Sequence, residues 1–272
     1  MDYAKNKQLL EKFATALADR ATSRHLLDLL VADTHFPVSS LWKSEFEFSS
    51  IFLRAASEMN ACQYDTGQSP AERLPLGKVV CILPGNGPIY TMAKILGPAF
   101  LMGNDLVFKL PSRLRRSHRV IIEMVHDFFP NVTVEYPDEK NHKSKMLSDA
   151  LFDPGVRATI IFGDDTWITP FSRMSKETAT KMIFEGPGND PAVVFPGADL
   201  QRAAREILAG TFYNGGQSCS AIKRVYVHRD VHQAFREALL AHVGSFKYGA
   251  AEDESVGIGP SQGPRLRQRV VE

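Results

Sequence analysis

The stretch Lys78-Val79-Val80-Cys81-Ile82-Leu83-Pro84-Gly85-Asn86-Gly87-Pro88 decides the fold of this chain. After Lys78 it begins with a continuous apolar run, which is typical of a strand buried on both faces of a parallel sheet. The proline and glycine residues that follow end the strand and open a loop. The stretch therefore predicts a buried strand that delivers a loop to one edge of a sheet.

Strand-like and helix-like segments alternate after this loop. Helices are predicted at 89–101, 115–129, 143–152 and from about 166, and strands at 105–109, 132–136 and 158–162. Because parallel neighbours need a crossover connection, the alternation predicts an α/β fold with a doubly wound, Rossmann-like parallel sheet. Ligands bind such sheets beyond the carboxyl ends of the strands, so the loops after Leu83, Phe108 and Phe162 are the expected site.

The preceding residues predict amphipathic helices. Apolar side chains recur at spacings of three and four from Asn6 to about Ala32, Pro37 interrupts them, and a second helical run covers 42–62. The polar, turn-rich stretch from Asp65 to Arg73 then ends this helical run.

A second α/β unit is predicted to begin near Gly186. Strands are expected at 192–195 and 224–227, and helices at 200–212 and 231–243. The predicted domains are therefore residues 1–185 and 186–272.

Composition argues against several classes of protein. The 272 residues include 32 Lys plus Arg and 31 Asp plus Glu, which gives a net charge of +1. This balance provides no positive electrostatic potential that would attract nucleic acid. Three cysteines, at 62, 81 and 219, provide neither a disulfide framework nor a zinc-type pair, and the histidines show no ligand spacing, so no metal is expected. Without a signal peptide pattern or a membrane-length apolar run, the expected location is the cytoplasm.

Asn214-Gly215-Gly216-Gln217-Ser218-Cys219 places a cysteine at the end of a glycine-rich turn. With little side-chain bulk beside it, this sulfur can be reached by an electrophile. The alternative is a buried structural thiol, since free cysteine is among the most buried residue types.

The segment from Gly210 through Cys219 to Val227 resembles the signature around the catalytic cysteine of the aldehyde dehydrogenase superfamily. Phe184-Glu185-Gly186-Pro187-Gly188-Asn189-Asp190-Pro191 is similar to the upstream glutamate motif of that family, and the separation 219 − 185 = 34 fits without an insertion. Two linked motifs in the right order are far more specific than either alone.

Three upstream segments extend the resemblance. The 84–88 loop resembles the Pro-Trp-Asn loop of the family with Gly85 in place of the aromatic residue, and 103–109 resembles its strand ending in a cofactor-binding lysine. Residues 161–165 occupy the position of its Phe-Thr-Gly-Ser turn. The resemblance implies a dinucleotide-binding domain over 1–185 and the start of a catalytic domain over 186–272.

The resemblance also implies NAD(P)-dependent oxidation of an aldehyde to an acid. Cys219 is the expected nucleophile, Asn86 and the Cys219 backbone N–H the expected oxyanion donors, and Glu185 the expected base that activates water. NAD or NADP is expected at the following residues: Lys109 for the ribose, the Gly163–Asp164 turn for the pyrophosphate, and Leu83, Pro84, Ser112, Phe162 and Gly186 around them.

Several departures from the family pattern keep alternatives open. Asp164 and Asp165 would repel a diphosphate unless they turn away. Ser112-Arg113 replaces a glutamate that often follows in NAD-preferring members, and an arginine there would tolerate a 2′-phosphate, which leaves NADP open. Gly186-Pro187-Gly188-Asn189 also resembles the CoA-acylating branch, but Glu185 favours the hydrolytic one.

Family members also continue well beyond this length. The chain is therefore expected to be a fragment of an enzyme that is homo-oligomeric at full length, or a truncated, inactive dehydrogenase-like binding protein.

Overall fold

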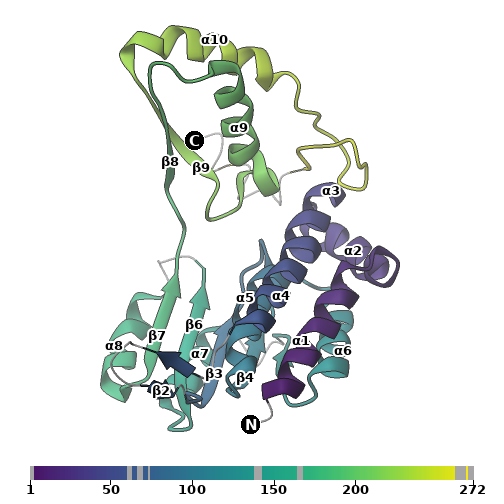
Figure 1. Ribbon diagram of the computed structural model, residues 1–272, viewed down its shortest axis with the longest axis vertical. Helices are drawn as coiled ribbons and strands as arrows, with labels where there is room; N and C mark the ends of the chain where they lie inside the picture. Colours follow the sequence, from purple (N-terminus) through teal and green to yellow (C-terminus); the bar gives the residue numbers. More distant parts are fainter. Residues whose placement is uncertain are drawn as a thin grey trace. The chain divides into compact units, whose positions relative to one another are not determined.

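The computed structural model describes residues 3–59, 63–65, 70–72, 74–137, 143–163, 168–260 and 268. The chain forms two compact units, one made of Met1–Leu29 and Lys43–Gly186 and the other of Leu30–Trp42 and Pro187–Glu272 (Figure 1). Residues 30–42, which the sequence analysis assigns to the first domain, thus group with the second unit. The functional roles of the two predicted domains stay predictions.

A five-stranded sheet in the order β5-β4-β3-β6-β7 forms the centre of the first unit. Its strands are β3 (Lys78–Ile82), β4 (Asp105–Lys109), β5 (Thr133–Glu135), β6 (Val156–Phe162) and β7 (Lys181–Glu185), and every neighbouring pair is parallel. The predicted doubly wound fold is therefore confirmed. The chain moves outward from β3 through β4 to β5 and then returns to the other side of β3, so the strand order switches direction between β3 and β6.

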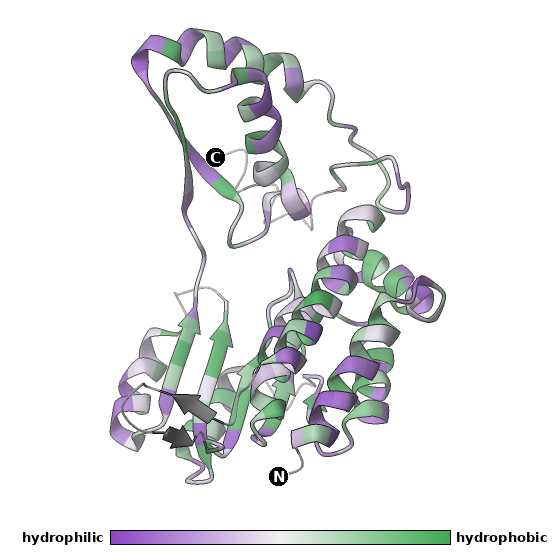
Figure 2. Ribbon diagram, in the orientation of Figure 1, coloured by the Kyte–Doolittle hydropathy of each residue, from purple (hydrophilic) through white to green (hydrophobic). Residues whose placement is uncertain are grey.

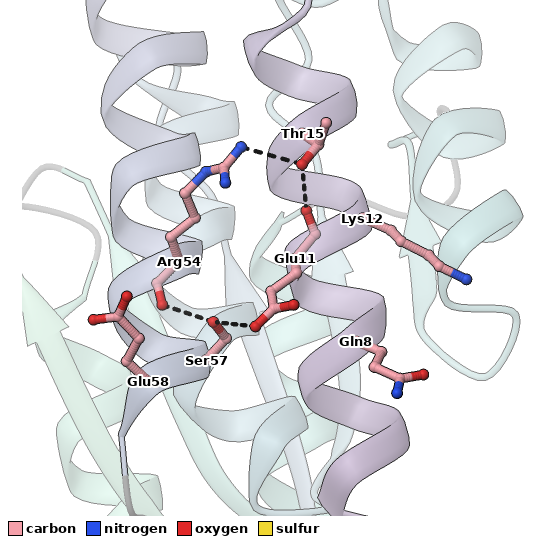
Figure 3. A pocket seen from close by; sticks show the side chains of 7 residues that line it. All are labelled: Gln8, Glu11, Lys12, Thr15, Arg54, Ser57 and Glu58. Carbon is pink, nitrogen blue, oxygen red and sulfur yellow. Dashed lines mark hydrogen bonds between the residues drawn. The ribbon is translucent and has the colours of Figure 1, made fainter.

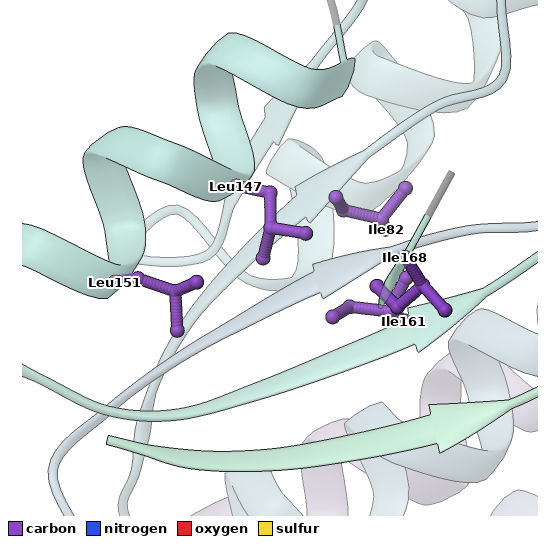
Figure 4. Close-up of a cluster of buried hydrophobic side chains, with 5 residues drawn as sticks. All are labelled: Ile82, Leu147, Leu151, Ile161 and Ile168. Carbon is purple, nitrogen blue, oxygen red and sulfur yellow. The ribbon is translucent and has the colours of Figure 1, made fainter. Parts of the chain in front are cut away.

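The helices of the crossovers cover this sheet. They are α5 (Pro88–Leu101), α6 (His118–Phe128), α7 (Lys143–Phe152) and α8 (Thr169–Thr178). Figure 2 shows that the strands are largely hydrophobic. In one part of the core, Leu147 and Leu151 of α7 pack against Ile82, Ile161 and Ile168 (Figure 4). Each such side chain contributes roughly 1.5–3 kcal/mol when fully buried, so α7 is fixed on the sheet by its apolar face.

The helices before the sheet follow the predicted pattern, and Asp19 separates the first two of them. Helix α1 (Tyr3–Ala18) ends at Asp19, whose carboxylate accepts hydrogen bonds from the Ala21 N–H at 3.1 Å and the Thr22 hydroxyl at 2.5 Å. This cap starts α2 (Arg20–Thr34). Pro37 separates α2 from the short helix α3 (Val38–Leu41), as predicted.

The second predicted helical run contains an irregularity that its sequence does not reveal. It begins with the π-helix η1 (Trp42–Glu47) and continues as α4 (Phe48–Glu58). Single π-helical turns often occur at functional sites. Glu45 lies in this turn and is buried.

The region between Ala61 and Leu74 is expected to be too short for the usual bridging hairpin of the family that the sequence resembles, and a shorter antiparallel pair of strands lies there. Strand β1 (Gln63–Asp65) pairs antiparallel with β2 (Pro70–Glu72). Two strands of three residues need only a short connection, and Pro70 stands at the first position of its strand, where its missing N–H is tolerated.

The second unit is a βαβ arrangement with an added helix. Strands β8 (Asp190–Val194) and β9 (Ile222–Val227) are parallel, α9 (Leu200–Phe212) connects them, and α10 (His232–Val243) follows. Its core consists of apolar side chains from these elements: Val194, Ala204, Ile207, Phe235 and Ala238. The Asp199 carboxylate caps α9 by accepting the Arg202 N–H at 3.0 Å.

Within the described ranges, none of the helices combines the length and the apolar character needed to cross a membrane.

Candidate active site

The carboxyl ends of the parallel strands bring most of the predicted site residues of the first unit to one edge. Ile82 is in register with both Lys109 and Ile161. Beyond these pairs, the Leu83 N–H donates to the Lys109 carbonyl at 3.0 Å, and the Gly163 N–H donates to the Glu185 carbonyl at 3.2 Å. The residues at or just after this edge are Leu83, Pro84, Asn86, Lys109, Ser112, Phe162, Gly163, Glu185 and Gly186. Asp164 lies outside the described residues.

Asn86 lies in the loop between β3 and α5. Asn86 is half-buried. Helix α5 begins two residues later at Pro88, and the missing N–H of this proline costs nothing because the N–H groups of the first helical turn have no partner within the helix. The Thr91 N–H closes that turn by donating to the Gly87 carbonyl at 3.0 Å. The side-chain amide is therefore carried by a short loop between a buried strand and a helix.

Glu45, which the sequence analysis does not identify, supports this loop from the π-helix η1. Its carboxylate accepts the Ile89 N–H at 2.8 Å and the Tyr90 N–H at 3.2 Å, so it satisfies two backbone donors at the start of α5. Burial raises the pKa of Glu45 to about 7, while the hydrogen bonds from Tyr90 and Ile89 act in the opposite direction. No periodicity or motif indicates this role.

Arg113 contacts the same loop from the turn that follows β4. Its Nη1 donates to the Gly85 carbonyl at 3.1 Å. Burial of the guanidinium lowers the pKa of Arg113. From the sequence, Arg113 is expected only beside a 2′-phosphate of the cofactor. Its hydrogen bond to Gly85 is not indicated by any motif.

The predicted ribose-binding residues differ in their environment. The Lys109 side chain is only 2% exposed, whereas Ser112 is exposed and its carbonyl accepts the Tyr136 hydroxyl at 2.8 Å. The Tyr136 ring stacks on His118 with centroids 4.0 Å apart. This contact fixes the segment after β5 against the start of α6.

Glu185 is the last residue of β7, and it is exposed. The next residue, Gly186, has no room for a side chain, because a Cβ there would lie 2.8 Å from the Phe184 ring. The carboxylate therefore stands at the carboxyl edge, in contact with solvent.

Cys219 belongs to the second unit, and it is exposed, whereas Cys81 is buried in β3. The exposed position removes the alternative of a buried structural thiol. The glycine run before it has a backbone reason, since Gly215 and Gly216 adopt φ values of 63° and 75° in the left-handed region. Asn214 shares that region at φ 49°, and its side-chain oxygen accepts the Ser40 hydroxyl at 2.8 Å.

Two residues outside the turn hold its backbone in place. The Lys223 ammonium donates to the carbonyls of Ser218, Cys219 and Ala221 at 2.9, 2.6 and 2.9 Å. These acceptors match the three donors of an ammonium group. Gly188 approaches from the other side so closely that an added Cβ would overlap the Cys219 carbonyl oxygen.

A groove between α1 and α4 contains none of the predicted site residues (Figure 3). The Arg54 guanidinium donates to the Thr15 hydroxyl at 3.1 Å, and the Ser57 hydroxyl lies 3.4 Å from the Glu11 carboxylate. These contacts join the two helices, so the groove is a polar seam between them.

The first unit defines a doubly wound α/β protein with its polar loops at the carboxyl edge, and the second unit presents an exposed thiol. Residues 1–272 match the model of the aldehyde dehydrogenase family. The chain belongs to this family.

Individual relatives agree with this assignment. An aldehyde dehydrogenase of Didymella fabae is 28% identical over 97% of this chain and 52% of its own length. An NADP(+) succinate-semialdehyde dehydrogenase of Mycolicibacterium paratuberculosis is also 28% identical, over 68% of this chain and 39% of its own. The chain thus spans about half the length of these relatives or less.

A solved structure shares the fold. Aldehyde dehydrogenase C of Pseudomonas syringae, determined with NAD+ and octanal, aligns with a TM-score of 0.87 at 21% identity, over 99% of this chain and 55% of that one.

Proposed function

We propose that the protein containing this chain oxidises an aldehyde to a carboxylic acid with NAD+ or NADP+, and that Cys219 is its nucleophile. The observation that carries the proposal is the exposure of Cys219 in a turn whose backbone carbonyls accept three hydrogen bonds from Lys223. A thiol must be accessible to attack a carbonyl carbon, and a fixed backbone limits the geometries that it samples.

In the first step, the Cys219 thiol would lose its proton to solvent, its sulfur would form a bond to the aldehyde carbon, and the carbonyl oxygen would become an oxyanion. The Asn86 amide and the Cys219 backbone N–H are suitable donors for that oxygen. Removing one such donor typically lowers the rate about a hundred- to a thousandfold. Asn86 and Cys219 lie in different units, so their convergence on one carbonyl is part of the proposal.

The intermediate then loses a hydride and becomes a thioester. A nicotinamide dinucleotide, when bound, supplies the hydride acceptor. The chemistry of the carboxyl edge fits such a group: the exposed Ser112 offers a hydroxyl for ribose oxygens, and the buried Lys109 ammonium would serve as a second donor if its side chain turned toward the cofactor. The name of the Mycolicibacterium paratuberculosis relative mentions NADP(+), and the solved complex contains NAD+, so both cofactors belong to the proposal.

Glu185 would complete the reaction. Its carboxylate takes a proton from a water molecule and the water oxygen bonds to the thioester carbon; the Cys219 sulfur then leaves and takes that proton from Glu185, which restores the thiol and the carboxylate. The products are a carboxylic acid and the free enzyme. Solvent exposure of Glu185 is consistent with access of water to this residue.

The test is a pre-steady-state measurement on the full-length gene product. Mixing with NAD+ or NADP+ and a panel of aldehydes is expected to give a burst of reduced cofactor that Cys219→Ala abolishes. Glu185→Gln is expected to retain the burst and lose steady-state turnover, because it blocks only hydrolysis. Absence of a burst with every aldehyde would refute the proposal, and formation of acyl-CoA in the presence of CoA would replace hydrolysis with acyl transfer.

A binding protein is the second candidate function. Apolar side chains of the β8–β9 region are exposed, with Val193 at 57%, Phe195 at 64% and Tyr226 at 52%. Parallel strands are normally covered on both faces, so this surface favours contact with further protein. A monomer in analytical ultracentrifugation that binds no apolar dye would contradict this candidate.

A further inference from the structure

The space beside Gly85 is filled by a charged side chain from another loop. A Cβ added at Gly85 would lie 2.7 Å from Nε, 2.9 Å from Cδ and 3.0 Å from Cζ of Arg113. The guanidinium therefore occupies the volume that a side chain at position 85 would enter. At this position the sequence has glycine where the Pro-Trp-Asn loop of the family has an aromatic residue.

The contact reaches the peptide that carries Asn86. The Gly85 carbonyl, which accepts the Arg113 Nη1–H at 3.1 Å, belongs to the peptide bond between Gly85 and Asn86. A hydrogen bond to this oxygen restricts rotation of that peptide plane, and the plane sets the direction in which the Asn86 side chain leaves the backbone.

Arg113 is itself held by a compact turn. The Leu114 N–H donates to the Pro111 carbonyl at 3.1 Å, the Arg115 N–H donates to the Arg113 carbonyl at 2.8 Å, and Leu114 is fully buried. The guanidinium is therefore presented from a fixed backbone, and little further entropy is lost when it binds the loop.

Glu45 contacts the loop on the other side of Asn86. A Cβ at Gly87 would lie 3.5 Å from the Glu45 carboxylate, which also binds the start of α5. Asn86 thus lies between Gly85, which contacts the Arg113 guanidinium, and Gly87, which lies near the Glu45 carboxylate. Only the Arg113 contact requires a glycine, because a Cβ at Gly85 would lie within 3.0 Å of the guanidinium, whereas a Cβ at Gly87 would be at an ordinary contact distance from Glu45.

We propose that Arg113 is a positioning residue for Asn86, because its guanidinium fills the space beside Gly85 and holds the Gly85–Asn86 peptide by its carbonyl oxygen. Its importance for catalysis rests on the proposed function, but the contact itself can be tested without it. The proposal differs from a role of Arg113 in binding a 2′-phosphate, which requires the guanidinium to face the cofactor.

The first experiment is a double-mutant cycle read by amide hydrogen exchange of the peptide covering residues 83–91. Arg113→Ala removes the hydrogen bond, and Gly85→Ala displaces the guanidinium, so each is expected to speed exchange about tenfold. The double variant is expected to exchange no faster than Arg113→Ala, because both changes remove the same contact. Arg113→Lys keeps a donor and is expected to restore part of the protection.

Arg115→Ala is the matched control, since this arginine is exposed in the same turn and its side chain is not part of the proposed contact. Unchanged exchange in Arg113→Ala, or fully additive effects in the cycle, would overturn the proposal. Weaker NADP+ binding in Arg113→Ala with unchanged loop exchange would also overturn it and assign the guanidinium to the 2′-phosphate.

Kinetics provide the second readout. In a preparation that shows the cofactor burst, Arg113→Ala and Gly85→Ala are expected to lower kcat at least tenfold with a smaller change in the KM for aldehyde, and Arg113→Lys to recover part of it. A wild-type protein without a burst would refute the proposed function, while the exchange cycle would still decide the role of Arg113.

Discussion

Glu45→Gln is expected to change how the stability of the chain depends on pH. In the folded protein the pKa of Glu45 is about 7, against an ordinary value of 4.5. Between these values the folded state holds one proton more than the unfolded chain, so the stability due to protonated Glu45 is present below pH 4.5 and is lost as the pH rises through about 7. The full difference between the folded and ordinary pKa values corresponds to about 3 kcal/mol of unfolding free energy.

The glutamine variant retains an oxygen that can accept the Ile89 N–H and removes the titration. The unfolding free energy of the variant minus that of the wild type is therefore expected to rise by roughly 2–3 kcal/mol between pH 5 and pH 8. For a chain of this size that equals a relative shift of roughly 4–12 °C in melting temperature. A constant cost of the substitution itself does not affect this comparison.

The measurement is thermal and urea denaturation by circular dichroism at several pH values from 5 to 8. Glu47→Gln is the matched control for the loss of a carboxyl group, since Glu47 is exposed in the same π-helical turn. A pH-dependent stability difference in this control as large as that of Glu45→Gln would show that burial of Glu45 is not the cause. A Glu45→Gln difference that is equal at pH 5 and pH 8 would show that the buried carboxyl does not titrate as argued.

The remaining predictions concern the cysteine turn. Gly188→Ala is expected to destabilise the chain by roughly 1–3 kcal/mol and to lower the alkylation rate of Cys219, because the new methyl group overlaps the Cys219 carbonyl oxygen. Gly244→Ala is the control for both measurements, since a Cβ there meets no atom within 4 Å. Lys223→Met is expected to speed hydrogen exchange in the turn about tenfold, and unchanged exchange would show that the lysine is not an anchor. Iodoacetamide with mass-spectrometric mapping is expected to modify Cys219 in the folded chain and Cys81 only after unfolding, since burial raises the pKa of the Cys81 thiol and blocks access; equal rates would contradict both assignments.

The sequence predicted the sheet well because its central strands are apolar on both faces. The run at 78–83 and the strand at 105–109 match β3 and β4 almost residue for residue. The edge strand β7 was not among the predicted strands, since its residues alternate between exposed and half-buried positions and form no continuous apolar run. Helix α6 begins at His118, later than the predicted 115, because Arg115 and Arg116 belong to the preceding turn.

The motifs indicated the candidate site residues, but they did not indicate what holds them. Glu45 is separated from Ile89 by 44 positions in the chain, and Arg113 from Gly85 by 28. Neither pair follows a helical or strand period, so the contacts arise only when the π-helix and the turn after β4 meet the loop in the folded unit. The short strands β1 and β2 were missed because three residues are too few to show a period.

The proposed reaction depends on these supporting contacts as much as on the motif residues. Two of the proposed groups lie where another residue contacts the backbone: Arg113 and Glu45 contact the loop that carries Asn86, and Lys223 contacts the carbonyl of Cys219. An amide or thiol displaced by about 1 Å loses much of its catalytic effect, on the order of a hundredfold in rate. A chain that keeps the motif residues but lacks these anchors would therefore resemble the family in sequence and turn over poorly.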